Sequence, residues 1–216
     1  MSHTLHRYGI NEADLQDDYV VFAIAAQTVN AKGIHPQFRE FEKIVMKYNP
    51  VNYGDMRTGN KFNVGMETVG SSYHDNSIVH AVFTDEATVT KVLKDLHEAN
   101  LDLSIVVSGL TDHTAACCHG AGIAPHTVEH SMGIWGKTDR LPSEDVLRVS
   151  TMCGHGMLSF NLIKDLAQKV AKKRMTSQQA AEKLAGLCHC GVFNPVRAVR
   201  IIDKIAADIN AGVEIK

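Results

Sequence analysis

The chain has 216 residues, a net charge of −2 from 22 Lys and Arg against 24 Asp and Glu, and 44% apolar residues. That length and apolar content are enough for one sizeable domain with a normal core. The balanced charge argues against nucleic acid and membrane surfaces as partners, because both need a clustered positive field. The longest apolar run, residues 19–26, is much shorter than the ~20 residues that cross a bilayer.

The first residues run into an acidic stretch at positions 14–18, without the charged and apolar regions of a secretion signal. We therefore expect a cytoplasmic protein. For its assembly we expect a homodimer, because two-fold homo-oligomers are the commonest soluble assemblies.

The first part of the chain predicts few regular elements. Residues 19–26 predict a buried strand or a buried helix, which periodicity cannot separate. Residues 36–48 predict a short helix. Residues 49–77 carry four glycines with Asn and Asp between them, which indicates loops and short edge strands.

A β-α-β unit follows with short connections. Residues 78–83 predict a strand, and residues 85–100 predict a helix with Asp85 and Glu86 in its first turn, where the helix dipole favours acidic groups. Residues 103–108 predict a second strand. This unit implies a sheet covered by a helix.

The second half is mainly helical. Alternating apolar residues predict a third strand at 128–134, and helical stripes predict helices at 160–170, at 176–187 and from Asn194-Pro195 onward. The expected class is α+β, with a small β-α-β-containing sheet at 1–110 and a helix-rich, Cys- and His-rich portion at 111–216. We expect the two portions to pack as one compact unit.

All five cysteines lie in one third of the chain, between Cys117 and Cys190. They occur in three short motifs, each of which contains a glycine and lies at a predicted helix boundary. Glycine lets the backbone approach a bulky group and leaves N–H donors for sulfur. The motifs are Cys117-Cys118-His119-Gly120, Met152-Cys153-Gly154-His155-Gly156 and Cys188-His189-Cys190-Gly191.

The expected positions of two cysteines near helix N-termini are a further reason to group these motifs. A helix N-terminus lowers a thiol pKa, and both metal binding and nucleophilic reaction need the thiolate. Cys153 is expected at the start of the 160–170 helix, and Cys190 lies just before the helix that begins at Asn194-Pro195. The helix dipole should therefore stabilise the thiolate form of both cysteines and lower their pKa values.

A shared metal centre is the leading interpretation. Its predicted ligands are Cys118 (with Cys117 as the alternative), Cys153, Cys188 and Cys190, a thiolate set that suits a 4Fe-4S iron–sulfur cluster or, second, zinc. Three cysteines would leave an open position that acts as a Lewis acid on a small polar substrate. His155 and His119 are the candidate acid/base residues. The expected reactions are hydration or dehydration, sulfur removal and thiol transfer.

Other uses of the same cysteines remain open. A non-enzymatic zinc- or cluster-binding protein would use them as a closed site that stabilises the fold. Cysteines without metal would simply pack in the core, or a pair such as Cys188 and Cys190 would make a thiol redox protein.

A second motif is His126-Thr-Val-Glu129-His130, an H-x-x-E-H string. On a helix, such residues can bind a divalent metal and activate water. The string resembles the metal-binding segment of S-ribosylhomocysteine lyase, which pairs H-x-x-E-H with a later cysteine. The resemblance implies a mononuclear metal hydrolase or lyase with Cys188 or Cys190 as third ligand. The alternative is polar residues on a half-exposed strand.

Two shorter signals complete the sequence evidence. Met152-Cys-Gly-His-Gly156 resembles the catalytic cysteine motif of proline racemases, which implies a reactive thiolate at Cys153. Asn194 and Arg197, beside the last cysteine pair and at a helix N-terminus, are candidates for binding a carboxylate or phosphate group of a cofactor or substrate. The alternative is a helix cap and a surface arginine.

Overall fold

The computed structural model describes residues 4–216. Within that range, five strands form one antiparallel sheet in the order β3-β2-β4-β1-β5. The strands are β1 (Tyr19–Ile24), β2 (Asn52–Asp55), β3 (Gly59–Asn60), β4 (Ile78–Phe83) and β5 (Ser104–Ser108). The helices are α1 (His35–Met46), α2 (Met66–Ser71), α3 (Glu86–Ala99), α4 (Thr111–Gly120), α5 (Glu144–Ser150), α6 (Phe160–Ala171), α7 (Ser177–Leu187) and α8 (Pro195–Asn210). The predicted α+β class is confirmed.

Two β-α-β units interlock in the sheet. Strand β4 lies between β1 and β2, and β1 lies between β4 and β5, so each β-α-β unit is split by one strand of the other. The unit predicted at 78–108 is confirmed as β4, α3 and β5. Residues 19–26 were expected to form either a strand or a helix, and residues 19–24 form β1, an inner strand of the sheet.

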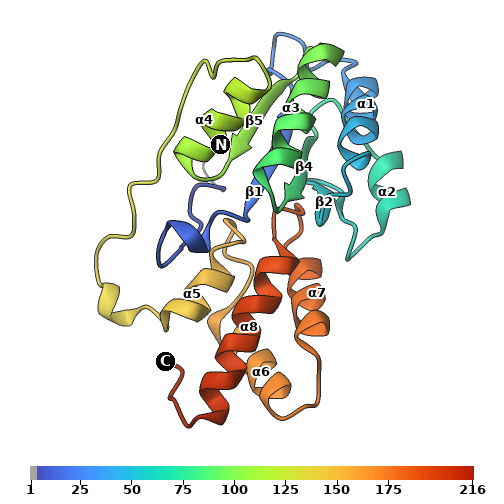
Figure 1. Ribbon diagram of the computed structural model, residues 1–216. Helices are drawn as coiled ribbons and strands as arrows, with labels where there is room; N and C mark the ends of the chain where they lie inside the picture. The colour runs from blue at the N-terminus through green and yellow to red at the C-terminus, as the bar shows by residue number, and fades with distance from the viewer. Residues whose placement is uncertain (1–3) are drawn as a thin grey trace.

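Helices cover both faces of the sheet. Alternate residues of β1 point to opposite faces: Tyr19 and Val21 pack with α1, α2, α3 and α4, whereas Val20 and Phe22 pack with the helices α5–α8. In Figure 1 the helices α5–α8, coloured from yellow to red, form the lower half, and the strands and the other helices form the upper half. No helix in residues 4–216 has both the length and the apolar composition to cross a membrane.

The predicted helices of the second half are confirmed as α6, α7 and α8, each with a side-chain cap at its start. The predicted strand at 128–134 is wrong. This segment belongs to an exposed, irregular stretch between α4 and α5, and none of it pairs with a strand. Alternating apolar residues cannot make a strand without a neighbour to accept the backbone hydrogen bonds.

Candidate functional site

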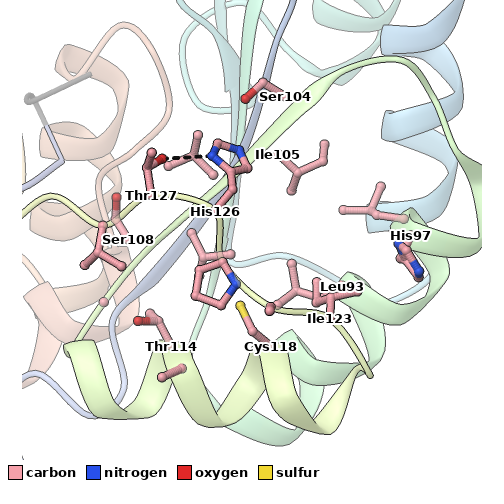
Figure 2. A pocket seen from close by; sticks show the side chains of 18 of the residues that line it. Leu93, His97, Ser104, Ile105, Ser108, Thr114, Cys118, Ile123, His126 and Thr127 are labelled. Atoms are coloured by element: carbon pink, nitrogen blue, oxygen red, sulfur yellow. Dashed lines mark hydrogen bonds between the residues drawn. The ribbon is translucent and has the colours of Figure 1, made fainter.

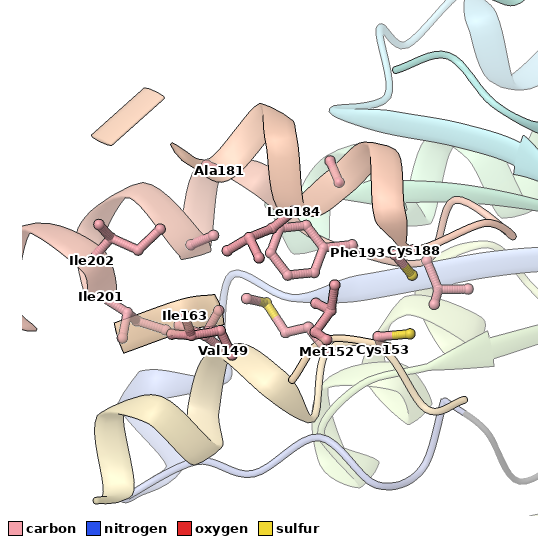
Figure 3. Close-up of a cluster of buried hydrophobic side chains, with 14 of the residues drawn as sticks. Val149, Met152, Cys153, Ile163, Ala181, Leu184, Cys188, Phe193, Ile201 and Ile202 are labelled. Carbon is pink, nitrogen blue, oxygen red and sulfur yellow. The ribbon is translucent and has the colours of Figure 1, made fainter. Parts of the chain in front are cut away.

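Three of the four predicted cysteine ligands lie together. Cys153 follows α5, Cys188 caps the C-terminus of α7, and Cys190 lies in the turn before α8. Cys153 and Cys190 are close enough to Cys188 to shift the pKa of its thiol, and all three side chains belong to the core between the sheet and α5–α8. Figure 3 shows Cys153 and Cys188 at the end of this core that is nearest the strands. We call Cys153, Cys188 and Cys190 the cysteine cluster.

The cluster is buried. Cys188 is 0% exposed, Cys190 1% and Cys153 2%, and none of the three forms a disulfide. The cluster therefore lies where the C-terminal helices meet the sheet, out of contact with bulk water.

Two asparagines of the sheet hold the turn that carries Cys188 and Cys190. The Asn60 side-chain amide donates to the carbonyl oxygens of Cys188 at 2.7 Å and Ala185 at 3.0 Å, and the Asn52 amide donates to that of Phe193 at 2.8 Å. All of these groups are away from water, where unpaired carbonyls would be costly. The β2–β3 hairpin thus fixes the backbone of the C-x-C motif.

The backbone after Cys190 lies so close to β2 that position 191 must be glycine. Gly191 has φ +81°, and a Cβ placed on it would lie 2.7 Å from the backbone nitrogen of Gly54 in β2. A Cβ on Gly54 would in turn lie 2.9 Å from the Cys190 carbonyl oxygen. Two glycines therefore let the cysteine turn rest directly on the sheet.

The surroundings of one cysteine in the cluster favour its thiolate form. A hydrogen bond from the Cys188 thiol lowers the pKa of Cys153 to about 6, although burial opposes the shift, and backbone N–H groups of Met157 and His155 help. The same hydrogen bond to Cys153, with that to Cys190 and burial, raises the pKa of Cys188 well above its usual value. The pair therefore favours the ionised form at Cys153 and the protonated form at Cys188.

The predicted cause of this shift is wrong. Cys153 does not open a helix: α6 begins at Phe160, and its cap is Ser159, whose side chain accepts from the Leu162 N–H. The N–H groups that reach Cys153 come instead from the Gly154–Gly156 turn and the residue after it.

His155 is the predicted acid/base residue that lies at the cluster. Its Nδ1 is 3.8 Å from the Cys190 sulfur, and its side chain is exposed. It therefore borders the cluster on the solvent side. His119, the other predicted acid/base residue, is exposed near the end of α4, on the opposite face of the sheet, and lies apart from these thiols.

Cys118 does not join the cluster. It lies on α4 and packs with the core on the far face of the sheet, as does its neighbour Cys117, whose thiol contacts the Glu86 carbonyl oxygen at 3.5 Å. Cys118 lines a cavity of about 810 Å³ between α3, α4, β5 and residues 122–129. Figure 2 shows its sulfur inside this cavity, and burial raises its pKa. A ligand set that includes Cys118 and the cluster is therefore not formed within this chain.

The H-x-x-E-H residues lie in the exposed stretch after α4. His126 Nδ1 is 3.1 Å from the Thr127 hydroxyl, His130 Nδ1 is 3.4 Å from the Thr111 hydroxyl, and Glu129 is exposed. This stretch is not helical, so the i, i+4 geometry of a helical metal motif is absent here. Cys188 and Cys190 lie on the other face of the sheet and are not near it.

Asn194 and Arg197 are both fully buried and bind the chain's own N-terminal segment. Asn194 caps α8 through the Arg197 N–H and donates to Asp18, while Arg197 pairs with Asp14 and Asp18. The structure thus uses both side chains to attach residues 14–18 to α8. Their predicted role in binding a carboxylate or phosphate stays untested.

His80 is a buried residue that no sequence motif singled out. It is 0% exposed in the centre of β4, and its ring centroid is 5.4 Å from that of Phe22. The sequence feature that could have identified it is a single histidine within the apolar run Ile78-Val-His-Ala-Val-Phe83.

The cysteine side chains do not already surround a common point. Among residues 4–216, no group of three or more His, Cys, Asp or Glu is arranged to hold a metal ion. The thiols meet as a hydrogen-bonded cluster, and metal binding would require their sulfurs to turn toward one centre.

No family model, curated protein or solved structure matches this chain.

Proposed function

We propose that the cysteine cluster binds a soft metal centre, an iron–sulfur cluster or a zinc ion, between the sheet and the C-terminal helices. The observation that carries this proposal is the meeting of three cysteines from two separate loops, where Cys188 and backbone N–H groups lower the pKa of Cys153. Thiolates select soft metals, and hydrogen bonds to the sulfurs are a usual part of such sites.

Burial favours a centre that stabilises the fold or carries electrons. Because each of the three cysteines is at most 2% exposed, a bound metal would lie away from bulk solvent. When bound, the metal supplies a link between the loop after α5 and the turn before α8, and its binding free energy adds to the folding free energy. The hydrogen bonds of Asn52 and Asn60 to the C-x-C turn support this role, because they hold the backbone of two of the three ligands in place.

An open-site enzyme is the second candidate, and His155 favours it. Three cysteines leave one metal position for a small polar substrate, and the exposed His155, next to Cys190, is placed to move a proton on the solvent side. The reaction would be of the lyase, desulfidase or thiol-transfer type. In this case a His155→Ala variant should keep the metal and the fold but lose turnover.

Anaerobic purification followed by iron, sulfide and zinc analysis and a visible spectrum tests the proposal. A brown protein with iron and sulfide indicates a cluster, and a colourless one with zinc indicates a single ion. The Cys153→Ser variant should lose the metal. Cys118→Ser is the matched control and should retain it, because Cys118 lies on the other face of the sheet.

Two results would contradict the proposal. Loss of metal in Cys118→Ser but not in Cys153→Ser would place the centre elsewhere. A wild-type protein without any metal would leave a dithiol, in which case mild oxidation should join Cys153 to Cys188 or Cys190 in a disulfide that peptide mass mapping detects.

A further inference from the structure

His80 lies on the face of the sheet that carries the cysteine cluster. Along β4, Ile78 and Val82 belong to the core that contains the cluster, whereas Val79 and Ala81 belong to the core on the other face. Because successive side chains of a strand alternate between faces, His80 points toward the cluster side. Its ring contact with Phe22, which belongs to the same core, agrees with this direction.

The strand register brings His80 close to Cys190. His80 is directly opposite Gly54 in the pairing of β2 with β4. Directly opposed residues point to the same face, with their Cβ positions roughly 5 Å apart. The Cβ position of Gly54 lies 2.9 Å from the Cys190 carbonyl oxygen. An imidazole that starts at His80 therefore lies within a side chain's length of the cysteine turn.

The chemistry of the neighbouring groups is that of a metal ligand set. Imidazole nitrogen and cysteine thiolate are the two ligand types that zinc and related metals combine most often, and three cysteines with one histidine form a closed tetrahedral set. The histidine lies on the sheet side of the cluster and is buried, whereas His155 is exposed on the solvent side.

We infer that His80 is the fourth ligand of the metal centre, together with Cys153, Cys188 and Cys190. The inference rests on the proposed function, because it needs a metal at the cluster. It makes the site a closed one, in which β4 of the sheet and the two cysteine loops of the helical half hold the same metal.

Cobalt(II), added anaerobically to the reduced full-length protein, is the probe. X-ray absorption should detect sulfur and one imidazole around the bound cobalt, and visible charge-transfer bands should report the thiolates. In His80→Ala the imidazole signal should disappear. In His155→Ala, the control for the other nearby histidine, it should remain.

A second variant, His80→Cys, tests the assignment by a gain of signal if His80→Ala fails to fold. His80→Cys should keep cobalt bound and raise the thiolate charge-transfer absorbance by about one third, because three thiolates become four. Circular dichroism of each variant checks the fold.

The outcomes separate the two claims. Cobalt bound by the wild type without imidazole, or with an imidazole that only His155→Ala removes, overturns the assignment of His80 and leaves the metal centre standing. An unchanged charge-transfer absorbance in a folded His80→Cys also overturns it. No cobalt binding by the wild type overturns the metal centre and the ligand together.

Discussion

Arg197 connects α8 to the N-terminal segment from a fully buried position. Its guanidinium pairs with Asp14 at 3.0 Å and with Asp18 at 3.2 Å, and it donates to the Tyr8 carbonyl oxygen. A buried ion pair that loses one partner leaves the other charge without compensation. Arg197 is therefore a buried residue that stabilises the fold, and the alternative expectation of a surface arginine is wrong.

Arg197→Met should lower the free energy of unfolding by about 3 kcal/mol, as expected when one partner of a buried pair is removed. Urea unfolding measures the loss. Arg200→Met is the matched control, because Arg200 pairs with Asp17 from the same helix but is half exposed. The control should cost less than ~1 kcal/mol. Equal losses in the two variants would contradict the role of burial.

Asp14 should make stability depend on pH in the acid range. Burial alone would raise its pKa, but a hydrogen bond from Arg148 and the charges of Arg197 and Arg148 outweigh burial and lower it below 3.8. A lowered pKa in the folded state stabilises at pH values above the unfolded pKa, and the contribution is lost as pH falls through the folded pKa.

The measurement is urea unfolding from neutral pH down to about pH 3, where the wild type should lose this contribution. Asp14→Asn should be less stable at neutral pH and should show a smaller fall in acid. Asp165→Asn is the control, since Asp165 forms an exposed pair with Lys169 on α6. A wild-type pH dependence that Asp14→Asn leaves unchanged would refute the assignment.

At the scale of elements, the contact between the cysteine turn and β2 depends on two glycines. Gly191→Ala should be strongly destabilising because its Cβ would meet the Gly54 backbone and its φ is positive. Gly212→Ala has nearly the same φ, +80°, but no atom lies within 4 Å of its Cβ position.

Gly212→Ala, the control, should lower the free energy of unfolding by only ~1–2 kcal/mol, the cost of a left-handed backbone at alanine. Gly191→Ala should lower it by roughly 1–3 kcal/mol more, because its Cβ overpacks the contact with β2. Thermal unfolding of the two variants gives the difference. Equal costs would mean that the turn can move away from β2 without loss.

The elements that sequence reasoning found have a wide apolar stripe or a strong cap. The residues of α3 that pack in the core, Val89, Val92, Leu93 and Leu96, recur at helical spacing after the capping Asp85. By contrast, α4 is Thr111-Asp-His-Thr-Ala-Ala-Cys-Cys-His-Gly120, with only Cys117 buried. It forms because α3 and β5 position it, and no stripe in its sequence predicts it. The short helices α2 and α5 were missed as well.

For the whole molecule, the sheet is the layer on which two cores meet. The N-terminal segment crosses between them: Thr4 bonds to Ser108 of β5, and Arg7 donates to the Val192 carbonyl oxygen next to the cysteine turn. The predicted division at residue 110 thus describes the order of elements along the chain, while residues from both halves build the core around the cluster. A cytoplasmic location and a homodimer stay predictions.

Removal of the proposed metal should loosen one side of this arrangement. With a chelator present, amide hydrogen exchange should rise in residues 150–158 and 188–194, which carry the cluster, because closing them on a metal contributes to local stability. Exchange in α3, which packs on the other face, should change little. Equal exchange with and without chelator would show that no metal holds these loops.

The sequence by itself determined the class, the long helices and the central β-α-β unit, since these follow from periodicity and caps. Short motifs also grouped Cys118, Cys153, Cys188 and Cys190 with His155 and His119, and of these Cys153, Cys188, Cys190 and His155 lie together. The tertiary structure decided which side of the sheet each residue faces. That placed Cys118 away from the cluster, turned Asn194 and Arg197 inward, and placed His80 of β4 on the face of the sheet that carries the cluster. The face of the sheet on which a side chain lies depends on strand register and on contacts between residues far apart in the chain. Local sequence patterns do not contain this information.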